Sequence, residues 1–236
     1  MGTIINCVAI LIGGICGLLF GKFVKPQLQD SLTKACGISV LFIGIAGALE
    51  KMLSVQDGAL TTGGTMLLVG CLALGTLIGE LFNIEAGFER FGQWLKKKTG
   101  NAKDGGFVDA FVTASFTVCI GAMAIVGAIE DGISGDWSVL AAKAVLDMII
   151  ILIMTCAMGK GCIFSAIPVA ILQGVVTVLA RFLQPIMTEA ALLNLSLVGS
   201  ALIFCVGVNL VWGKTLRVAN MLPAVILAIL AAFLPI

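Results

Sequence analysis

Apolar residues fill the chain in long blocks, and short polar or charged stretches separate one block from the next. Many blocks approach the ~20 residues with which an α-helix crosses a hydrocarbon core of ~30 Å. A helix also satisfies every backbone N–H and C=O within its own segment, as a bilayer core requires. The pattern therefore predicts about eight spanning helices, at residues 3–21, 35–50, 60–80, 107–129, 137–158, 162–182, 190–212 and 218–235.

The composition supports the same conclusion and leaves no room for a soluble domain. Apolar residues make up 60% of the 236 positions, charged residues make up 11%, and the mean hydropathy is +1.15. A soluble globular domain carries roughly 25% charged residues, so this chain could not give a globule a polar surface. We therefore expect an all-α fold, a polytopic membrane helix bundle that forms one integral membrane domain over residues 1–236.

Several kinds of chemistry lack their usual residues in this chain. There is no histidine, which is the commonest metal ligand and the side chain that titrates near neutral pH. The net charge of +1 provides no basic surface for nucleic acid. The eight cysteines form no C-x-x-C pair, and we interpret them as small apolar side chains packed between helices. We expect no metal, no cofactor, no nucleic-acid partner and no enzymatic activity.

The lysines and arginines predict an orientation, because they gather in the cytoplasmic loops of membrane proteins. With an external N-terminus, most of the 14 basic residues fall in cytoplasmic loops: Lys22, Lys25, Lys34, Arg90, Lys96, Lys97, Lys98, Lys103, Lys160, Lys214 and Arg217. The external loops then hold Lys51 and Arg181, and Lys143 lies within a span. This bias predicts that both termini face outward.

The longest predicted loop contains an amphipathic segment at residues 84–98. Its apolar residues Ile84, Phe88, Phe91 and Trp94 recur at intervals of three and four, and three consecutive lysines follow them. Such a segment is typical of an interfacial helix with a basic end near anionic lipid headgroups. The lysines need no partner beyond lipid, so an ordinary anchoring segment explains the pattern equally well.

A short motif recurs three times, with a glycine near the middle of a predicted span. The glycines are Gly44, Gly121 and Gly207, and each follows a small residue seven positions earlier. The simplest explanation is a helix-pair unit used in spans 1–2, 3–4 and 6–7. Two interpretations of the glycines stay open: close packing of helix backbones, or a place where a helix breaks or meets a ligand.

The order of these units predicts an inverted relation between them. The first two units enter the membrane from outside, whereas the third, displaced by span 5, enters from inside. Spans 3–5 and 6–8 would then form an inverted-topology pair, with spans 1–2 as a duplicated prefix. Transporters often use such repeats and bind substrate near the midplane between them. Chance recurrence of small apolar residues is the alternative.

Two charged residues lie inside a predicted span, where each costs ~2.5–3.5 kcal/mol on insertion scales. They are Lys143 and Asp147, four residues apart on span 5 and therefore on one helical face. One hypothesis makes them part of an ion or proton pathway. The other makes them a structural pair in which each charge neutralises its neighbour, with Lys143 also able to extend toward the outer surface.

Other polar residues are weaker candidates. Gln173 and Asn209 are amides inside predicted spans, where they either contribute to a pathway or bond to a neighbouring helix. Glu130, Asp131 and Asp136 follow span 4 in one external loop. They would form either an electronegative vestibule that concentrates cations or ordinary solvated loop charges.

Five segments of the chain resemble the YdfK/YqgA-like family of bacterial inner-membrane proteins. They are Gly2-Thr-Ile-Ile-Asn6 with Gly13-Gly14; Ile78-Gly-Glu-Leu81; Cys119-Ile-Gly-Ala-Met-Ala-Ile-Val-Gly127 leading to Asp131-Gly132; Phe164-Ser-Ala-Ile-Pro168; and Arg217-Val-Ala-Asn-Met-Leu-Pro223. The resemblance runs nearly from end to end. It implies a bacterial, integral, transporter-like protein, and it supplies no substrate.

The leading hypothesis is a small membrane transporter or channel for an ion or a small polar solute. A bundle of this size usually needs a partner to bury polar helix faces, so we expect a homo-oligomer surrounded by lipid. The competing hypothesis is a non-transporting scaffold or sensor that acts through the basic loop.

Overall fold

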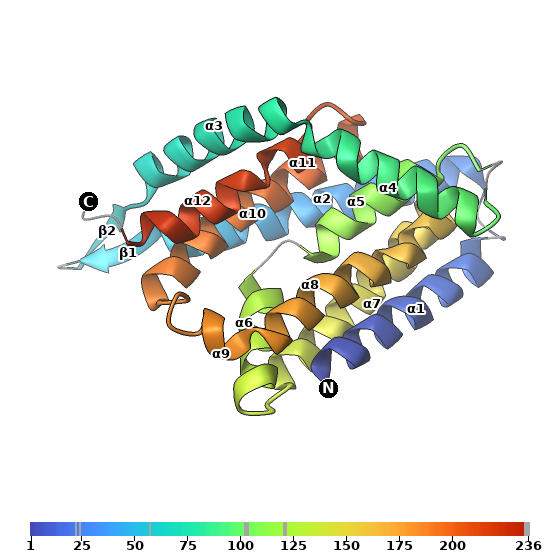
Figure 1. The fold of residues 1–236 in the computed structure, drawn as a ribbon. Helices are drawn as coiled ribbons and strands as arrows, with labels where there is room; N and C mark the ends of the chain where they lie inside the picture. The colour runs from blue at the N-terminus through green and yellow to red at the C-terminus, as the bar shows by residue number, and fades with distance from the viewer. Residues whose placement is uncertain (22, 24, 57, 102–103, 120–121, 234–236) are drawn as a thin grey trace.

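The computed structural model describes the chain apart from residues 22, 24, 57, 102–103, 120–121 and 234–236, and it is almost entirely helical (Figure 1). The elements are α1 (Gly2–Gly21), α2 (Pro26–Met52), β1 (Leu53–Gln56), β2 (Ala59–Thr62), α3 (Thr65–Phe82), α4 (Ile84–Lys98), α5 (Phe107–Cys119), α6 (Ala122–Ile133), α7 (Ser138–Met158), a 3₁₀ helix η1 (Lys160–Ser165), α8 (Ala166–Val178), α9 (Ala180–Leu183), α10 (Glu189–Trp212), α11 (Val218–Met221) and α12 (Pro223–Ala231).

Six of the described helices are long and apolar enough to cross a membrane, and they match six of the predicted spans. They are α1, the Asp30–Met52 part of α2, α3, α7, Lys160–Val178 and α10. The predicted span 107–129 corresponds to α5 and α6, which are inclined to each other by 61° and would count as a seventh crossing. The last predicted span corresponds to the shorter apolar segment Val218–Ala231, so eight crossings stay a prediction.

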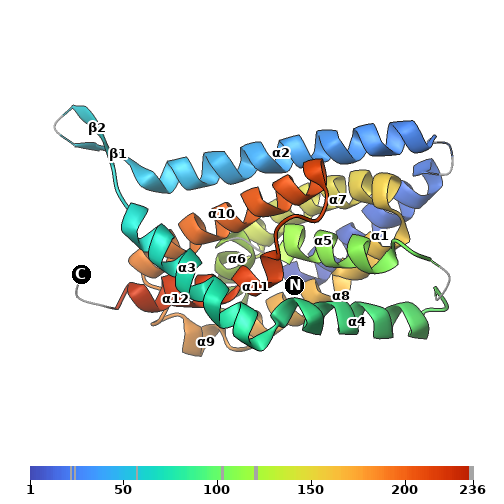
Figure 2. The same ribbon diagram turned by 90° about the horizontal axis from the view of Figure 1, so that it is seen from above.

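The predicted start of the third span at residue 60 lies in a β-strand instead of a helix, because β1 and β2 pair in a hairpin. Leu53 pairs with Thr62 and Gln56 pairs with Ala59 in this antiparallel hairpin, which projects from one end of the bundle beside α2 (Figure 2). Val and Thr favour strands over helices. Gly64, with φ of +74°, then lies directly before α3.

The long helices pack in pairs whose backbones approach closely at glycine. A Cβ at Gly13 of α1 would overlap the carbonyl of Met148, and one at Gly17 would lie 2.6 Å from the carbonyl of Leu152, so α1 and α7 run parallel. A Cβ at Gly79 of α3 would overlap the carbonyl of Asn220. Small residues permit such approaches, which contribute van der Waals contact that larger residues would prevent.

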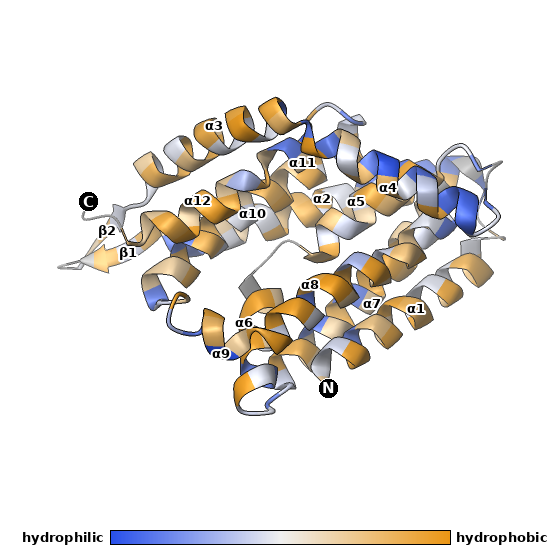
Figure 3. Ribbon diagram, in the orientation of Figure 1, coloured by the Kyte–Doolittle hydropathy of each residue, from blue (hydrophilic) through white to orange (hydrophobic). Residues whose placement is uncertain are grey.

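The pairing of helices places both described chain ends at the same end of the bundle. α2 lies antiparallel along α10, and α3 lies antiparallel to α11 and α12. The start of α1 and the end of α12 therefore share one end with the β-hairpin. Hydrophilic residues gather instead along α4 and the adjoining loops (Figure 3), where Arg90, Lys96–Lys98 and Lys214 lie.

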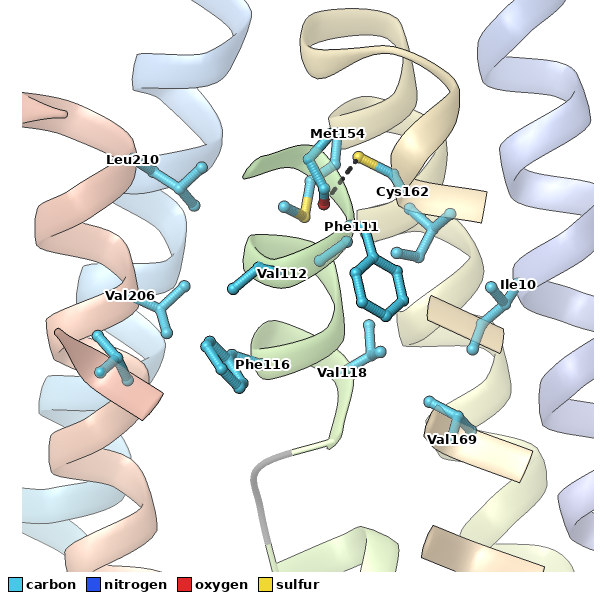
Figure 4. Packing of buried hydrophobic residues seen from close by; sticks show 14 of the residues in the cluster. Ile10, Phe111, Val112, Phe116, Val118, Met154, Cys162, Val169, Val206 and Leu210 are labelled. Carbon is cyan, nitrogen blue, oxygen red and sulfur yellow. Dashed lines mark hydrogen bonds between the residues drawn. The ribbon is translucent and has the colours of Figure 1, made fainter. Parts of the chain in front are cut away.

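The short helix α5 lies at the centre of the bundle. Phe107 and Phe111 are fully buried there, with Val206 of α10 on one side of the helix and Ile10 of α1 on the other (Figure 4). The Cys162 thiol of η1 donates to the α5 carbonyl of Ala110 across 3.6 Å. The described part of α5 contacts η1, α4, α7, α8 and α10.

The predicted amphipathic segment forms α4 within its predicted bounds. Phe88 and Phe91 pack against α5, with ring centroids of Phe88 and Phe116 4.9 Å apart. Trp94 is 52% exposed, and the Lys98 ammonium lies 5.1 Å above its ring centre. The apolar face of α4 therefore contacts the bundle, whereas its basic end is exposed.

Candidate functional site

Lys143 and Asp147 form an ion pair on α7. Their side chains are 8% and 5% exposed, and Asp147 lies roughly 14 Å along the helix from Ser138, its first residue. Residues four apart share one face of a helix, so α7 itself brings the two charges together. The sequence prediction that they face the same way is confirmed.

Asn6 of α1 extends this ion pair into a network that joins three helices. Its Nδ2 donates to Asp147 Oδ2 at 3.0 Å and to Oε1 of Gln173, on α8, at 3.3 Å. Asn6 is 0% exposed and Gln173 is 1% exposed. Because an ionised carboxylate only accepts hydrogen bonds, the Asn6 amide must turn its NH₂ group toward Asp147.

A backbone carbonyl from α5 completes the surroundings of the lysine. The Lys143 ammonium donates to the carbonyl oxygen of Val118 at 2.8 Å. Val118 lies in the last described turn of α5, and α5 and α6 are inclined to each other by 61°. We name Asn6, Val118, Lys143, Asp147 and Gln173 the polar cluster.

The polar cluster contains two hydrogen-bonding atoms that the described residues leave unpaired. They are the acceptor Asn6 Oδ1 and the donor Gln173 Nε2. Leaving a buried polar atom unpaired costs about 1–3 kcal/mol. These two atoms therefore lack the hydrogen-bond partners that buried polar groups usually have. The Cys7 thiol, next to Asn6 in the chain, donates to the carbonyl of Ala166 across 3.7 Å.

Two of the three repeated glycines lie in the contact between α2 and α10, away from the polar cluster. A Cβ at Gly44 would lie 2.5 Å from the backbone nitrogen of Phe204, and one at Gly207 would lie 2.8 Å from that of Leu41. Leu41 and Phe204 hold the same position in the repeated motif, so the two contacts are reciprocal. Gly121, the third motif glycine, lies outside the described residues.

Asn209 supports the loop that follows α10. Its Oδ1 accepts from the backbone N–H of Thr215 at 3.0 Å and of Leu216 at 2.8 Å. Its Nδ2 donates to the carbonyl of Leu216 at 2.7 Å. These bonds hold the chain between α10 and α11 in place, and they belong to the opposite end of the bundle from the start of α1.

The three predicted vestibule carboxylates have separate surroundings. Asp131, 3% exposed, accepts from the Met1 ammonium at 2.8 Å and from the Gly2 N–H at 2.9 Å, which ties the start of α1 to α6. Asp136 is exposed and accepts from the Ser138 N–H at 2.9 Å, and this bond lowers its pKa. Glu130 is half-buried on α6.

A cavity of about 530 Å³ opens between α2, α4, α5 and α10 at the basic end of the bundle. Charged and polar side chains line it, among them Lys34, Glu85, Asp109 and Lys214. Lys214 pairs with the buried Glu85 at 2.9 Å and also with Glu89. Desolvation acts to lower the pKa of Lys214, but its bonds to the two glutamates outweigh this and raise it.

Phe116 separates this polar cavity from a second, apolar one. The second cavity, about 450 Å³, lies between α4, α5, α8, α10 and α12, and Phe116 lines both. Cys119 at the end of α5 is part of its wall. From the basic end, the polar cavity therefore extends along α5 as far as Phe116, three residues before α5 ends at Cys119.

Sequence reasoning missed Asn6 and Val118 as members of the site. Asn6 is an amide near the start of an otherwise apolar block, and its position within a predicted span could have marked it as a candidate. Val118 contributes a backbone carbonyl, for which the side-chain pattern contains no signal.

The long apolar helices and the buried network define a polytopic helical membrane protein. The chain matches the family described as "Protein of unknown function (DUF554)" over residues 1–233, and it belongs to that family. It is 29% identical over 235 residues to the "Uncharacterized protein YqgA" of Escherichia coli (strain K12), covering 97% of this chain and 94% of that protein.

A second relative comes from a different bacterium. The chain is 26% identical over 226 residues to the "Uncharacterized membrane protein YdfK" of Bacillus subtilis (strain 168), covering 96% of this chain and 93% of that protein. No solved structure matches the chain. The membrane assignment of this relative agrees with the apolar helices described above.

Proposed function

We propose that this protein moves an ion or a small polar solute across the bacterial inner membrane, with the polar cluster in its path. The observation that carries the proposal is the buried Lys143–Asp147 pair, bonded to the end of α5 where the helix direction changes. Ionisable groups inside a membrane usually mark ion or substrate pathways. Discontinuous helices commonly form transporter binding sites.

The incomplete bonding of the cluster supports a pathway over a purely structural pair. A buried ion pair contributes little net stability, and well-packed apolar residues often replace one at no cost. The cluster in addition leaves Asn6 Oδ1 and Gln173 Nε2 unpaired. A group whose sole task was to join three helices would gain stability from satisfying both atoms.

The reciprocal contact of α2 and α10 supports an inverted repeat. The two helices are antiparallel, carry the same motif, and exchange equivalent contacts at Gly44 and Gly207. We propose that α1–α3 and the segment from Lys160 to Ala231 are the related halves. This pairing differs from the sequence-based one of spans 3–5 with 6–8, which stays a prediction. Alternating access in transporters commonly occurs between such halves.

The polar cavity at the basic end fits the inner mouth of the pathway. In the proposed orientation both termini face outward. The basic residues at the other end of the bundle, including Lys34, Lys98 and Lys214, then face the cytoplasm. Phe116 then forms the barrier between this mouth and the end of α5. Closing and opening at Phe116 would expose the cluster to one side of the membrane.

We propose further that the protein works as a homo-oligomer. α3 contacts the bundle mainly through α11 and α12, and the other side of this helix carries large exposed residues such as Val69, Leu74, Leu77 and Leu81. A second copy would cover this face, with lipid as the alternative cover. Cross-linking through single cysteines placed at Leu77 would capture a dimer, and single cysteines at Ile15 provide the comparison.

A scaffold or sensor is the second candidate, and the exposed basic end of α4 favours it. Lys96–Lys98 form the last turn of α4, a helix that packs on the bundle, and there they are available to anionic lipid or a partner. Removing the three charges by substitution with glutamine would abolish the cellular phenotype of a scaffold, whereas it would leave solute flux in vesicles intact.

Flux in reconstituted vesicles tests the proposal. The purified chain is placed in liposomes and assayed with radiolabelled sodium, rubidium and chloride, with an entrapped pH dye for protons, and by osmotic shrinkage with urea and glycerol. The proposal expects at least one probe to cross faster than in protein-free liposomes. Equal rates for every probe, with the protein folded in the vesicles, would contradict it.

A further inference from the structure

We propose that the Lys143 ammonium is a tethered cation: it occupies, between the Val118 carbonyl and the Asp147 carboxylate, a site whose ligands suit a free monovalent cation. The inference rests on the proposed function only for its consequence, which is that movement through this protein needs neither sodium nor potassium. That the Lys143 ammonium fills this cation site is a claim about binding, and binding measurements test it without any flux assay.

The ligands around the ammonium are those of a cation site. Val118 offers a carbonyl from the last turn of α5, where the partial negative charge of the helix end attracts cations. Asp147 offers a carboxylate oxygen. In transporters with broken helices, such half-helix ends and unwound carbonyls coordinate sodium ions or protons.

A further acceptor lies next to the same carboxylate. Asn6 donates to Asp147 through Nδ2, and its Oδ1 is buried without a partner among the described residues. Amide and carboxylate oxygens are ordinary ligands of hard cations. Among the described residues, the Lys143 ammonium thus bonds to one anionic side chain, Asp147, and to one neutral oxygen, the carbonyl of Val118.

The charge balance decides between the tethered cation and a free one. Lys143 and Asp147 neutralise each other, so a second monovalent cation at this depth would be an uncompensated charge, which is expensive away from water. Sodium or potassium is therefore excluded while Lys143 is in place. Removing the lysine side chain leaves a buried carboxylate that requires a proton or a free cation.

The Lys143→Ala variant tests the site most directly, because it empties the position of the ammonium and keeps the Asp147 carboxylate. The substitution removes three methylene groups and the ammonium, and propylammonium replaces those atoms one for one. n-Propanol has the same length without the charge. The Lys143→Ala/Asp147→Asn double variant contains the same void without the carboxylate, and it is the matched control.

Thermal unfolding of the detergent-purified chain, followed with a thiol-reactive dye that reports the eight cysteines, measures binding without any flux. We expect propylammonium chloride to raise the Tm of Lys143→Ala in a saturable manner. The half-maximal concentration should be at least about tenfold higher for the double variant, and n-propanol should produce no saturable rise. Sodium or potassium chloride should stabilise Lys143→Ala more than choline chloride at equal ionic strength.

The wild-type chain provides the opposite test. Its Tm should be the same in sodium, potassium and choline chloride at equal ionic strength. A selective rise with sodium or potassium would overturn the proposal, because it would show a free cation site beside Lys143. An equal response of Lys143→Ala and the double variant to propylammonium would overturn it as well.

Failure of Lys143→Ala to fold also has a defined meaning. Recovery of folded Lys143→Ala only when propylammonium is present during purification is a predicted result. Failure even in its presence, while the double variant folds, would overturn the tethered cation. A vesicle assay without flux would contradict the proposed function and leave these binding results unchanged, so the two failures are distinguishable.

Discussion

Asn6 and Gln173 are 167 residues apart in the chain, and the Nδ2 of Asn6 donates to the Oε1 of Gln173 at 3.3 Å. The same Asn6 amide donates to Asp147, so one side chain on α1 joins α7 to α8 at the polar cluster. This junction, adjoining the end of α5, distinguishes the interior of the bundle from a simple packed core.

Asn6→Leu should destabilise the protein by about 1–3 kcal/mol, because it leaves buried acceptors on Asp147 and Gln173 without their donor. Thermal unfolding in detergent measures the effect. Asn194→Leu is the matched control, since Asn194 is also a helical amide but bonds only to the carbonyl of Ala228 at 3.2 Å among the described residues. An equal loss in both variants would argue against the junction.

Asp147→Asn should cost about 3–5 kcal/mol, because it leaves the Lys143 ammonium buried without its counter-charge. The double variant Lys143→Met/Asp147→Asn should recover much of that loss. The exposed pair Asp30 and Lys34 has the same spacing, at 2.7 Å, and its double-mutant cycle should give a coupling below about 1 kcal/mol. Similar coupling for both pairs would contradict the described burial of the α7 pair.

Gly44→Ala and Gly207→Ala should each destabilise the bundle by about 1–3 kcal/mol, because a methyl group there meets the backbone of the facing helix. Gly174→Ala is the control: a Cβ at Gly174 meets nothing within 4 Å, and alanine is the better helix former by about 1 kcal/mol. Gly174→Ala should therefore be neutral or stabilising. Unfolding midpoints of the three variants check the prediction.

Lys214→Met should lower stability by about 1–2 kcal/mol at neutral pH, because it removes the partner of the buried Glu85. The pKa of Lys214 is raised above its ordinary 10.5, so its contribution is complete below that pH and is lost as the pH rises through the raised value. The difference between wild type and Lys214→Met should be constant from neutral pH to about pH 10 and shrink above it. A difference that shrinks well below pH 10 would contradict the prediction.

The sequence predicted the parts of the fold that depend on local pattern. Long apolar blocks marked the spanning helices, and the interval between Ile84, Phe88 and Phe91 located α4. The β-hairpin was missed because Ala59 and Leu60 precede an uncharged stretch, residues 61–64, that was read as the start of the following hydrophobic block. The last predicted span was expected to be one helix, whereas Pro223 starts a new short helix, α12, after α11.

The candidate site was predictable only where one helix carries it. Lys143 and Asp147 were found because their spacing alone places them on one face. Their partners come from α1, α5 and α8, and contacts between helices depend on packing that one sequence does not specify. Asn209 was a candidate either for the pathway or for a structural bond, and its side chain bonds to the loop after α10 beside the polar cavity.

The most direct test of the pathway compares two charge-pair variants in the vesicle assay, using whichever probe the wild-type protein moves. Lys143→Met/Asp147→Asn removes the buried pair without leaving an unpaired charge, and Glu50→Gln/Lys51→Met removes a surface ion pair on α2 that lines neither cavity. Both are first shown to be folded by their unfolding midpoints. A pathway through the polar cluster predicts flux reduced by at least about tenfold in the first variant and unchanged flux in the second. Wild-type flux in the first variant would contradict it.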